Sequence, residues 1–179
     1  MEKNQDTAAG GLEVAIVGKE AFVRVTGRGT FELGPGLKSF GLAAIGTGCQ
    51  RLTMYMENCT GMDSTFLGVV AGLAFRLRQR GGELVMLNLS PRNSGLLTTL
   101  GLGGLIGTGE WRPGLGPLPP EMHKLHASAD KRTLAETMLL AHEHLAAVAP
   151  QNVPKFKDLL TCLREDLKKI VPEDTRPEA

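Results

Sequence analysis

Residues 51–89 read RLTMYMENCTGMDSTFLGVVAGLAFRLRQRGGELVMLNL, and this stretch decides the fold. Apolar side chains alternate with others over residues 51–56, which predicts a strand. Residues 57–61 are typical of a turn. Residues 84–87 are apolar without alternation, as in a strand that is covered on both faces. Because a helical pattern separates the two runs, the stretch predicts a strand, helix and strand unit with parallel strands.

The predicted helix in this unit has marked ends. Asp63 or Ser64 can cap its first turn. Arginines crowd its last turns, where the helix dipole favours cations, and Gly81-Gly82 supplies a left-handed stop. Its apolar face consists of Leu67, Val70, Ala71, Ala74 and Leu77.

The sequence on either side adds elements to this unit. Residues 13–17 and 21–25 are β-branched runs around a Gly-containing turn, which predicts an antiparallel hairpin. The other patterns predict a helix over 31–45, a short helix over 90–100 and an edge strand within 102–108. The predicted order is β-β-α-β-α-β-α with a last strand, which is an α/β fold over residues 12–110.

A different pattern follows this domain. Residues 111–120, WRPGLGPLPP, hold too many prolines and glycines for a helix or strand and predict a linker. Apolar residues then step by four and three over 134–148 and again over 156–170, which predicts a helical hairpin within residues 121–171 with Asn152 as an N-cap. A two-helix hairpin alone rarely buries enough area to be stable. We therefore expect it to cover part of the α/β domain or a second protomer, the latter giving a homodimer.

Charge and hydropathy narrow the classes of partner. Lys plus Arg number 20 and Asp plus Glu 19, so the formal charge is +1 over 179 residues. A net charge this close to zero gives no positive electrostatic field to attract the phosphates of DNA or RNA, so we expect no nucleic-acid partner. The apolar stretches are shorter than the roughly 18 residues that a membrane span needs, so we expect no membrane insertion. Cys49, Cys59 and Cys162 have no paired spacing, and residues 1–11 lack a basic, then apolar, leader, which together favour a cytoplasmic location.

The sequence contains none of the motifs considered below for an enzyme, and we expect a non-enzymatic protein. It contains no GxGxxG or P-loop motif for a nucleotide and no GxSxG nucleophile turn, so we predict no catalytic residues and no cofactor. His123 and His126 have the spacing that places two imidazoles on one helix face, which is one requirement of a metal site. His142 and His144 diverge around a helix, and no cysteine lies near. We therefore predict no metal site and expect solvated helix positions for the histidines.

Residues 62–68, MDSTFLG, place hydroxyl groups after a strand and at the start of the crossover helix, where α/β folds expose backbone N–H groups. Here the sequence resembles the STAS family, the domain of anti-sigma factor antagonists and of sulphate transporter tails, over about residues 12–108. The resemblance rests on residues 62–65, 67–70, 81–85, 88–91 and 100–102. It implies a small mixed sheet with helices packed on one side, plus the two-helix appendage.

The resemblance also implies a function. Antagonists of this kind are bacterial, non-enzymatic regulators of transcription that act by partner switching. Their serine after the Asp is phosphorylated by a kinase that is also the anti-sigma factor, which implies phosphorylation at Ser64, with Thr65 as the alternative. The partner-binding residues implied are Thr30, Asp63, Ser64, Thr65 and Phe66. We expect Asp63 to be the helix cap and the Ser64 hydroxyl to face solvent.

A second hypothesis is a structural STAS subunit that docks on a transporter or a signalling assembly without phosphorylation. Its support is the added hairpin and three departures from the family pattern. Phe66 stands where the family usually has Gly, Tyr55 where Asp or Asn is common, and Thr30 where an acidic residue is common.

Overall fold

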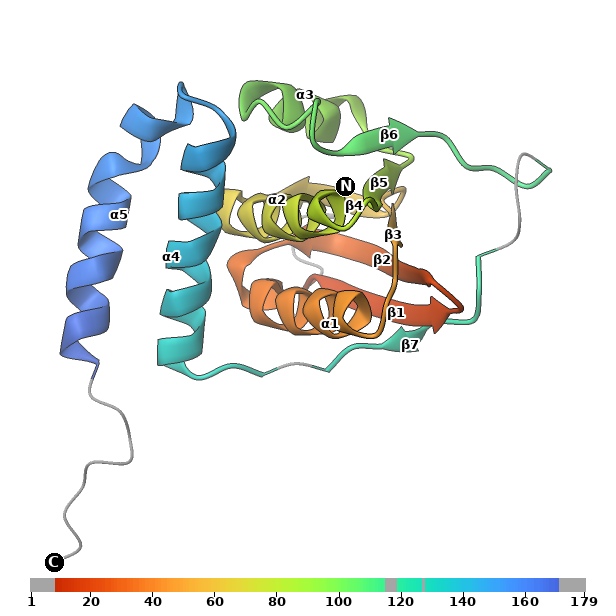
Figure 1. Ribbon diagram of the computed structural model, residues 1–179, viewed down its shortest axis with the longest axis horizontal. Coiled ribbons are helices and arrows are strands. Elements are labelled where there is room, and N and C mark those ends of the chain that lie inside the picture. The colour runs from red at the N-terminus through yellow and green to blue at the C-terminus, as the bar shows by residue number, and fades with distance from the viewer. Residues whose placement is uncertain (1–8, 115–118, 127, 171–179) are drawn as a thin grey trace, which may run out of the picture.

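The structure, a computed structural model, describes residues 9–114, 119–126 and 128–170 (Figure 1). Two antiparallel strands, β1 (Gly11–Val17) and β2 (Glu20–Gly29), open the fold and pair from Gly11 opposite Thr26 to Val17 opposite Glu20. Gly18 in the turn has φ +60, a conformation that costs glycine little. The predicted hairpin is confirmed.

The sheet grows outward from this hairpin. β3 (Arg51–Tyr55) is parallel to β2, β5 (Glu83–Leu87) is parallel to β3, and β6 (Gly107–Gly109) is parallel to β5. The strand order is β6-β5-β3-β2-β1-β7, where β7 (His123–Lys124) is the outer strand beside β1. The parallel unit predicted over residues 51–89 is confirmed, whereas the last strand predicted within 102–108 is limited to the three residues of β6.

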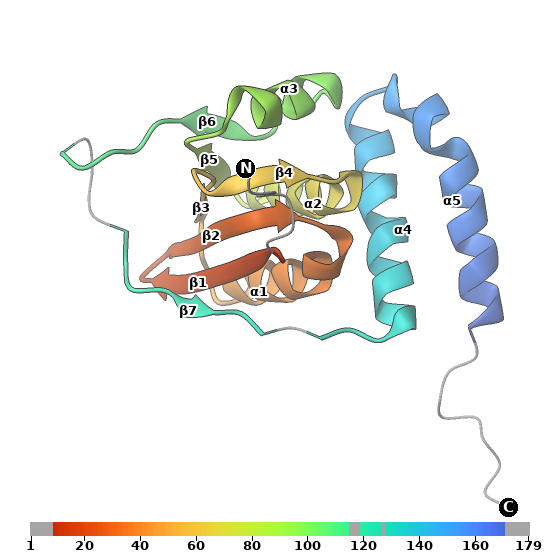
Figure 2. The same cartoon turned by 180° about the vertical axis from the view of Figure 1, so that it is seen from behind.

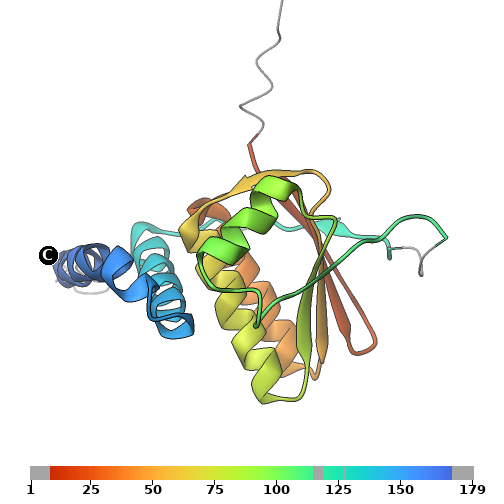
Figure 3. The ribbon, with the colours of Figure 1, turned by 90° about the horizontal axis from the view of Figure 1, so that it is seen from above.

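Helices α1 (Gly34–Gly46) and α2 (Ser64–Gln79) lie side by side on one face of the sheet, as Figure 3 shows from above. A short 3-10 turn, η1 (Phe31–Leu33), leads into α1, and α3 (Pro91–Thr99) follows β5. The core between sheet and helices is almost wholly aliphatic and sulphur-containing. It includes Leu37, Leu52, Met54, Met56, Leu67, Leu77, Leu84 and Met86.

Strand β4 (Cys59–Met62) corrects the turn that the sequence predicts over residues 57–61. β4 is parallel to β2 and pairs with its second half, Gly27–Gly29, while β3 pairs with the first half. The pairing contains a register shift between Gly27 and Arg28. Such a short strand with Gly61 inside shows no alternation, so only its partner strand reveals it.

The chain ends in α4 (Lys131–Val148) and α5 (Asn152–Lys169), which form the predicted hairpin. α4 packs across α2 and α1, and α5 packs on α4, so the molecule is layered as sheet, α1 and α2, α4 and then α5 (Figures 1 and 3). The hairpin thus covers the α/β domain of its own chain. The linker predicted over residues 111–120 is described only in part, because residues 115–118 lie outside the described ranges.

β7 corrects the prediction for His123 and His126. His123 pairs with Val14 of β1, and the Leu125 N–H donates to the Leu12 carbonyl at 2.8 Å. The two histidines therefore do not share a helix face. β7 lies along the outer edge of β1 (Figure 2), whose backbone groups pair with it.

Asn152 is not the N-cap of α5, because Gln151 holds that position without a side-chain hydrogen bond. The Asn152 side chain is 0% exposed, and its Nδ2 donates to the carbonyls of Leu145 at 2.8 Å and Leu100 at 2.9 Å. It therefore ties the turn between α4 and α5 to the loop after α3.

Asn152→Ala is expected to lower the free energy of unfolding by about 1 to 3 kcal/mol, because it leaves two carbonyls without their donor in a buried place. Urea unfolding of the full chain measures the change. Gln151→Ala is the matched control, expected to stay within about 0.5 kcal/mol, as exposed positions do. Equal stability of the two variants would show that the Asn152 bonds do not hold the turn.

Candidate functional site

Asp63 organises the start of α2. Its Oδ1 accepts from the Phe66 N–H at 2.8 Å and its Oδ2 from the Phe31 N–H at 2.7 Å. Its own N–H donates to the Gly29 carbonyl at 2.9 Å. The predicted cap is confirmed, and the same carboxylate also fixes η1 beside the first turn of α2.

Ser64, the first residue of α2, does not have the solvent-facing hydroxyl that the sequence predicts. Its Oγ lies 2.9 Å from Nε2 of His142 in α4. The other ring nitrogen, Nδ1, lies 2.7 Å from the Met138 carbonyl. A carbonyl only accepts, so Nδ1 carries a proton, and in the neutral ring Nε2 accepts a hydrogen bond from the Ser64 hydroxyl.

His142 also corrects the expectation of solvated histidines. It is 1% exposed, and its ring stacks edge-on against Phe156 of α5, with 4.9 Å between ring centroids. Ser64 and His142 are 78 residues apart in the chain, so only the docking of α4 brings them together.

Two of the residues predicted to bind a partner are buried. Thr65 is 3% exposed and Phe66 is 0% exposed. The Phe66 ring lies against Gly29, and a Cβ added to Gly29 would come within 2.9 Å of that ring. The large side chain at position 66 therefore fits because the last residue of β2 is a glycine. Thr30 is partly exposed, as are Asp63 and Ser64.

Phe31 is the aromatic residue that sequence reasoning missed at this surface. It is 39% exposed and follows Thr30 directly, with its N–H on Asp63. The pattern that starts a helix at residue 31 does not reveal which aromatic side chain turns outward. We define the Ser64 surface as Thr30, Phe31, Glu32, Asp63 and Ser64.

Tyr55 has a structural role. It is buried at the end of β3, its ring meets the Trp111 ring edge-on at 6.1 Å, and burial raises the pKa of its phenol. Asn88, with φ 59, exchanges two hydrogen bonds of 2.8 Å with the Trp111 backbone. These contacts hold the chain after β6 against the ends of β3 and β5.

A serine bound to an imidazole whose other nitrogen is held by a carbonyl is the geometry that nucleophilic catalysis uses. Neither Ser64 nor His142 lines the cavities at the junction of α1, α2 and α4, beside Phe75, or at the end of β5. None of these cavities therefore brings a substrate to the pair. Nowhere among the described residues do three or more His, Cys, Asp or Glu side chains gather as a metal site.

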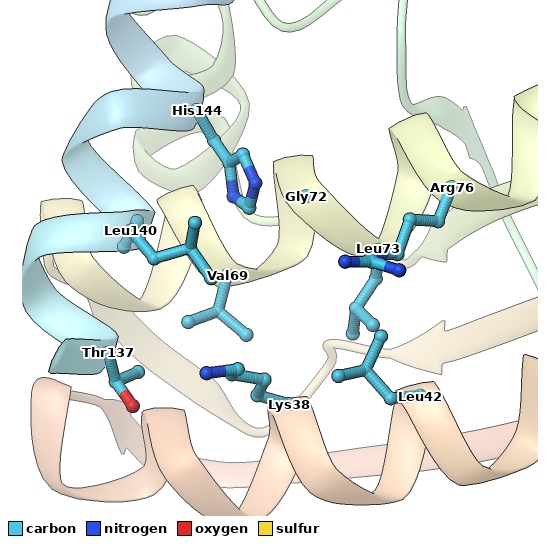
Figure 4. A pocket seen from close by; sticks show the side chains of 10 residues that line it. Lys38, Leu42, Val69, Gly72, Leu73, Arg76, Thr137, Leu140 and His144 are labelled. Carbon is cyan, nitrogen blue, oxygen red and sulfur yellow. The ribbon is translucent and has the colours of Figure 1, made fainter. Parts of the chain in front are cut away.

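A cavity of about 30 Å³ lies where α1, α2 and α4 meet (Figure 4). This volume holds two or three water-sized groups, at about 10 to 15 Å³ each. Lys38, Arg76 and His144 line it from the three helices. The His144 ring lies on Gly72, and its Nδ1 donates to the Gly68 carbonyl at 3.3 Å.

Acidification is expected to destabilise the protein through His144. Burial lowers the pKa of His144, and the charges of Arg76 and Lys38 lower it further, against the opposite effects of the Gly68 carbonyl and Glu143. The folded chain thus binds this proton less readily than the unfolded chain. The stability is complete above the unfolded pKa of about 6.5 and falls as the pH drops from there through the lowered folded value.

Urea unfolding at about pH 7.5 and about pH 5.5 measures this loss, on either side of the unfolded histidine pKa. His144→Asn keeps a donor for the Gly68 carbonyl and removes the titrating ring, so it should lose less stability between the two pH values than the wild-type chain. An equal loss in both proteins would assign the pH dependence to other groups.

The family model described as STAS domain matches residues 7–113 of the sequence. The chain belongs to the STAS domain family. Helices α4 and α5 lie outside the matched residues, so the Ser64 partner His142 comes from an addition to the STAS domain.

Solved structures share this STAS fold. The unphosphorylated form of the anti-sigma factor antagonist SpoIIAA has 22% sequence identity and a TM-score of 0.50, over 54% of this chain and 86% of that chain. TM1081 from Thermotoga maritima has 14% identity and a TM-score of 0.51, over 56% of this chain and 86% of that chain. No curated protein sequence gives a significant match. Among the described residues, no helix has both the length and the apolar character that crossing a membrane requires.

Proposed function

We propose that this protein is a non-enzymatic STAS regulator of transcription in the bacterial cytoplasm. It binds a protein partner, a kinase-like anti-sigma factor, at the Ser64 surface, and phosphorylation of Ser64 weakens that binding. The observation that carries the proposal is the position of Ser64. It directly follows the capping Asp63, opens α2, and lies on the same surface as the exposed Phe31.

The expected effect of phosphate is electrostatic. It adds about −1.5 to −2 charges at the N-terminus of α2, where the helix dipole favours anions, so the helix itself tolerates the modification. The same charge lies beside the Asp63 carboxylate and repels carboxylates of a partner. Weakening a complex by a factor of a hundred to a thousand requires only about 3 to 4 kcal/mol.

Ser64→Ala is expected to remove phosphate uptake. The test incubates the full chain with an extract of the source cells and ATP and maps phosphate by mass spectrometry. Ser39→Ala, an exposed serine of α1, is the matched control and should keep full uptake. Phosphate that persists in Ser64→Ala, for example on Thr65, would remove Ser64 from the proposal.

The same substitution is expected to cost about 1 to 3 kcal/mol of stability, because it leaves the buried Nε2 of His142 without a donor. This is more than the loss of under 1 kcal/mol that a surface serine would give. Urea unfolding of Ser64→Ala and Ser39→Ala separates the two expectations.

The Ser64 to His142 hydrogen bond also favours the second hypothesis, a structural STAS subunit. In that case the hydroxyl serves to hold α4 on the domain and the protein does not cycle through phosphate. Intact mass of the protein from cells, with and without phosphatase, distinguishes the two. A single unmodified mass would support the structural subunit.

A further inference from the structure

The proposed function names an outside protein that phosphate on Ser64 displaces, and the structure also places a segment of the chain itself beside Ser64. α4 already occupies the end of the STAS domain that carries Ser64, since it packs on η1, α1 and α2. A partner for the Ser64 surface is therefore present within the chain itself.

α4 and α2 approach each other closely where they cross. A Cβ at Gly68 would lie 2.3 Å from the Ala141 carbonyl oxygen, and one at Gly72 would lie 2.3 Å from the His144 ring. Small residues on one helix thus let the backbone of the other approach, and Ser64, one helical turn before Gly68, meets His142 on the same face.

Phosphate at Ser64 is incompatible with this arrangement. Phosphorylation replaces the hydroxyl proton with a PO₃ group, so Oγ loses the proton that it donates to His142. The 2.9 Å between Oγ and Nε2 has room for a proton and not for a phosphate group. If the phosphate turns toward solvent instead, Nε2 stays buried without a donor.

With the His142 ring neutral, both arrangements cost the docked state free energy and leave the released state unaffected. An unsatisfied buried nitrogen changes an equilibrium about 5- to 150-fold. The coupling is reciprocal, so docking of α4 lowers the equilibrium constant for phosphorylation of Ser64 by the same factor.

We propose that phosphate on Ser64 also switches a second partner, the chain's own C-terminal hairpin, which phosphorylation releases from α2. The inference rests on the proposed function for its biological use. Its physical content, the coupling between a phosphate at Ser64 and the docking of α4, is independent of any kinase.

The experiment places phosphoserine at position 64 during translation and follows amide hydrogen exchange of the full chain by mass spectrometry. Exchange in residues 131–148 is expected to accelerate about 5- to 150-fold relative to the wild-type chain, while the core strands β2, β3 and β5 keep their protection. Phosphatase treatment of the same sample should restore the wild-type rate. Gly68→Ala gives the reference for a displaced α4, and Gly95→Ala, in α3 with open space around it, is the matched control.

Several outcomes would overturn the inference. One is exchange in α4 within about twofold of the wild-type rate. A second is slower exchange in α4, which would mean that the phosphate holds α4 in place through His142. A third is equal acceleration in the core strands, which would mean general destabilisation. Because phosphoserine is installed directly, failure here leaves partner switching with an outside protein intact. Conversely, absence of phosphate on Ser64 in cells would reject the proposed function without changing the measured coupling.

Discussion

Replacing Phe66 with alanine is expected to lower the free energy of unfolding by about 3 to 5 kcal/mol, the usual cost of removing a buried aromatic ring. Phe66 is 0% exposed and its ring fills the space above Gly29. Gly29 has no side chain to close the cavity, so we expect the loss at the upper end of this range. Denaturant unfolding, with the midpoint and slope fitted separately, measures it.

Phe31→Ala is the matched control for this variant. It removes the same ring from a side chain that is partly exposed, so the stability should change by less than about 1 kcal/mol. Under the proposed function it should weaken partner binding instead, because aromatic residues often carry the energy of an interface. Similar losses of stability in the two variants would place Phe31 in the core and remove it from the Ser64 surface.

Gly68→Ala is expected to displace α4. The new Cβ would lie 2.3 Å from the Ala141 carbonyl oxygen, a backbone atom that cannot move without its helix. Overpacking of this kind costs about 1 to 3 kcal/mol. Thermal unfolding should show a lower midpoint, and limited proteolysis should cut within residues 131–148 before it cuts the sheet.

Gly95→Ala tests whether this loss comes from the contact. Gly95 is helical and exposed in α3, with no atom near the position of an added Cβ. Alanine in a helix is favoured over glycine by about 0.5 to 1 kcal/mol, so this variant should be slightly more stable than wild type. A Gly68→Ala protein as stable as Gly95→Ala would show that α4 does not pack closely on α2.

The sequence predicts those elements whose signals are local. Alternation over residues 51–56, the apolar face of α2 and the Gly81-Gly82 stop each depend on neighbouring residues, and the structure confirms them. The two hairpin helices follow from their apolar spacing in the same way.

Features that depend on a distant partner could not be predicted. β4 has no pattern of its own and exists because Gly27–Gly29 pairs with it. β7 exists because the outer edge of β1 accepts it. The burial of His142, and with it the surroundings of Ser64, depends on how α4 crosses α2, which no local pattern around residue 142 encodes.

The short pairing of β7 with β1 sets how far a released hairpin could travel. Leu125 is bonded to Leu12 at the sheet edge and α4 begins at Lys131, so the chain length between them allows a separation of at most about 18 Å. Without β7 the connection to α4 would begin after Trp111, which is bonded to Asn88, and would reach roughly 65 Å. Such a short linker keeps the effective concentration of α4 at its docking site in the millimolar range. An outside protein that competes for this face therefore has to bind α2 much more tightly than the tethered helix does, or meet the chain when Ser64 is already modified.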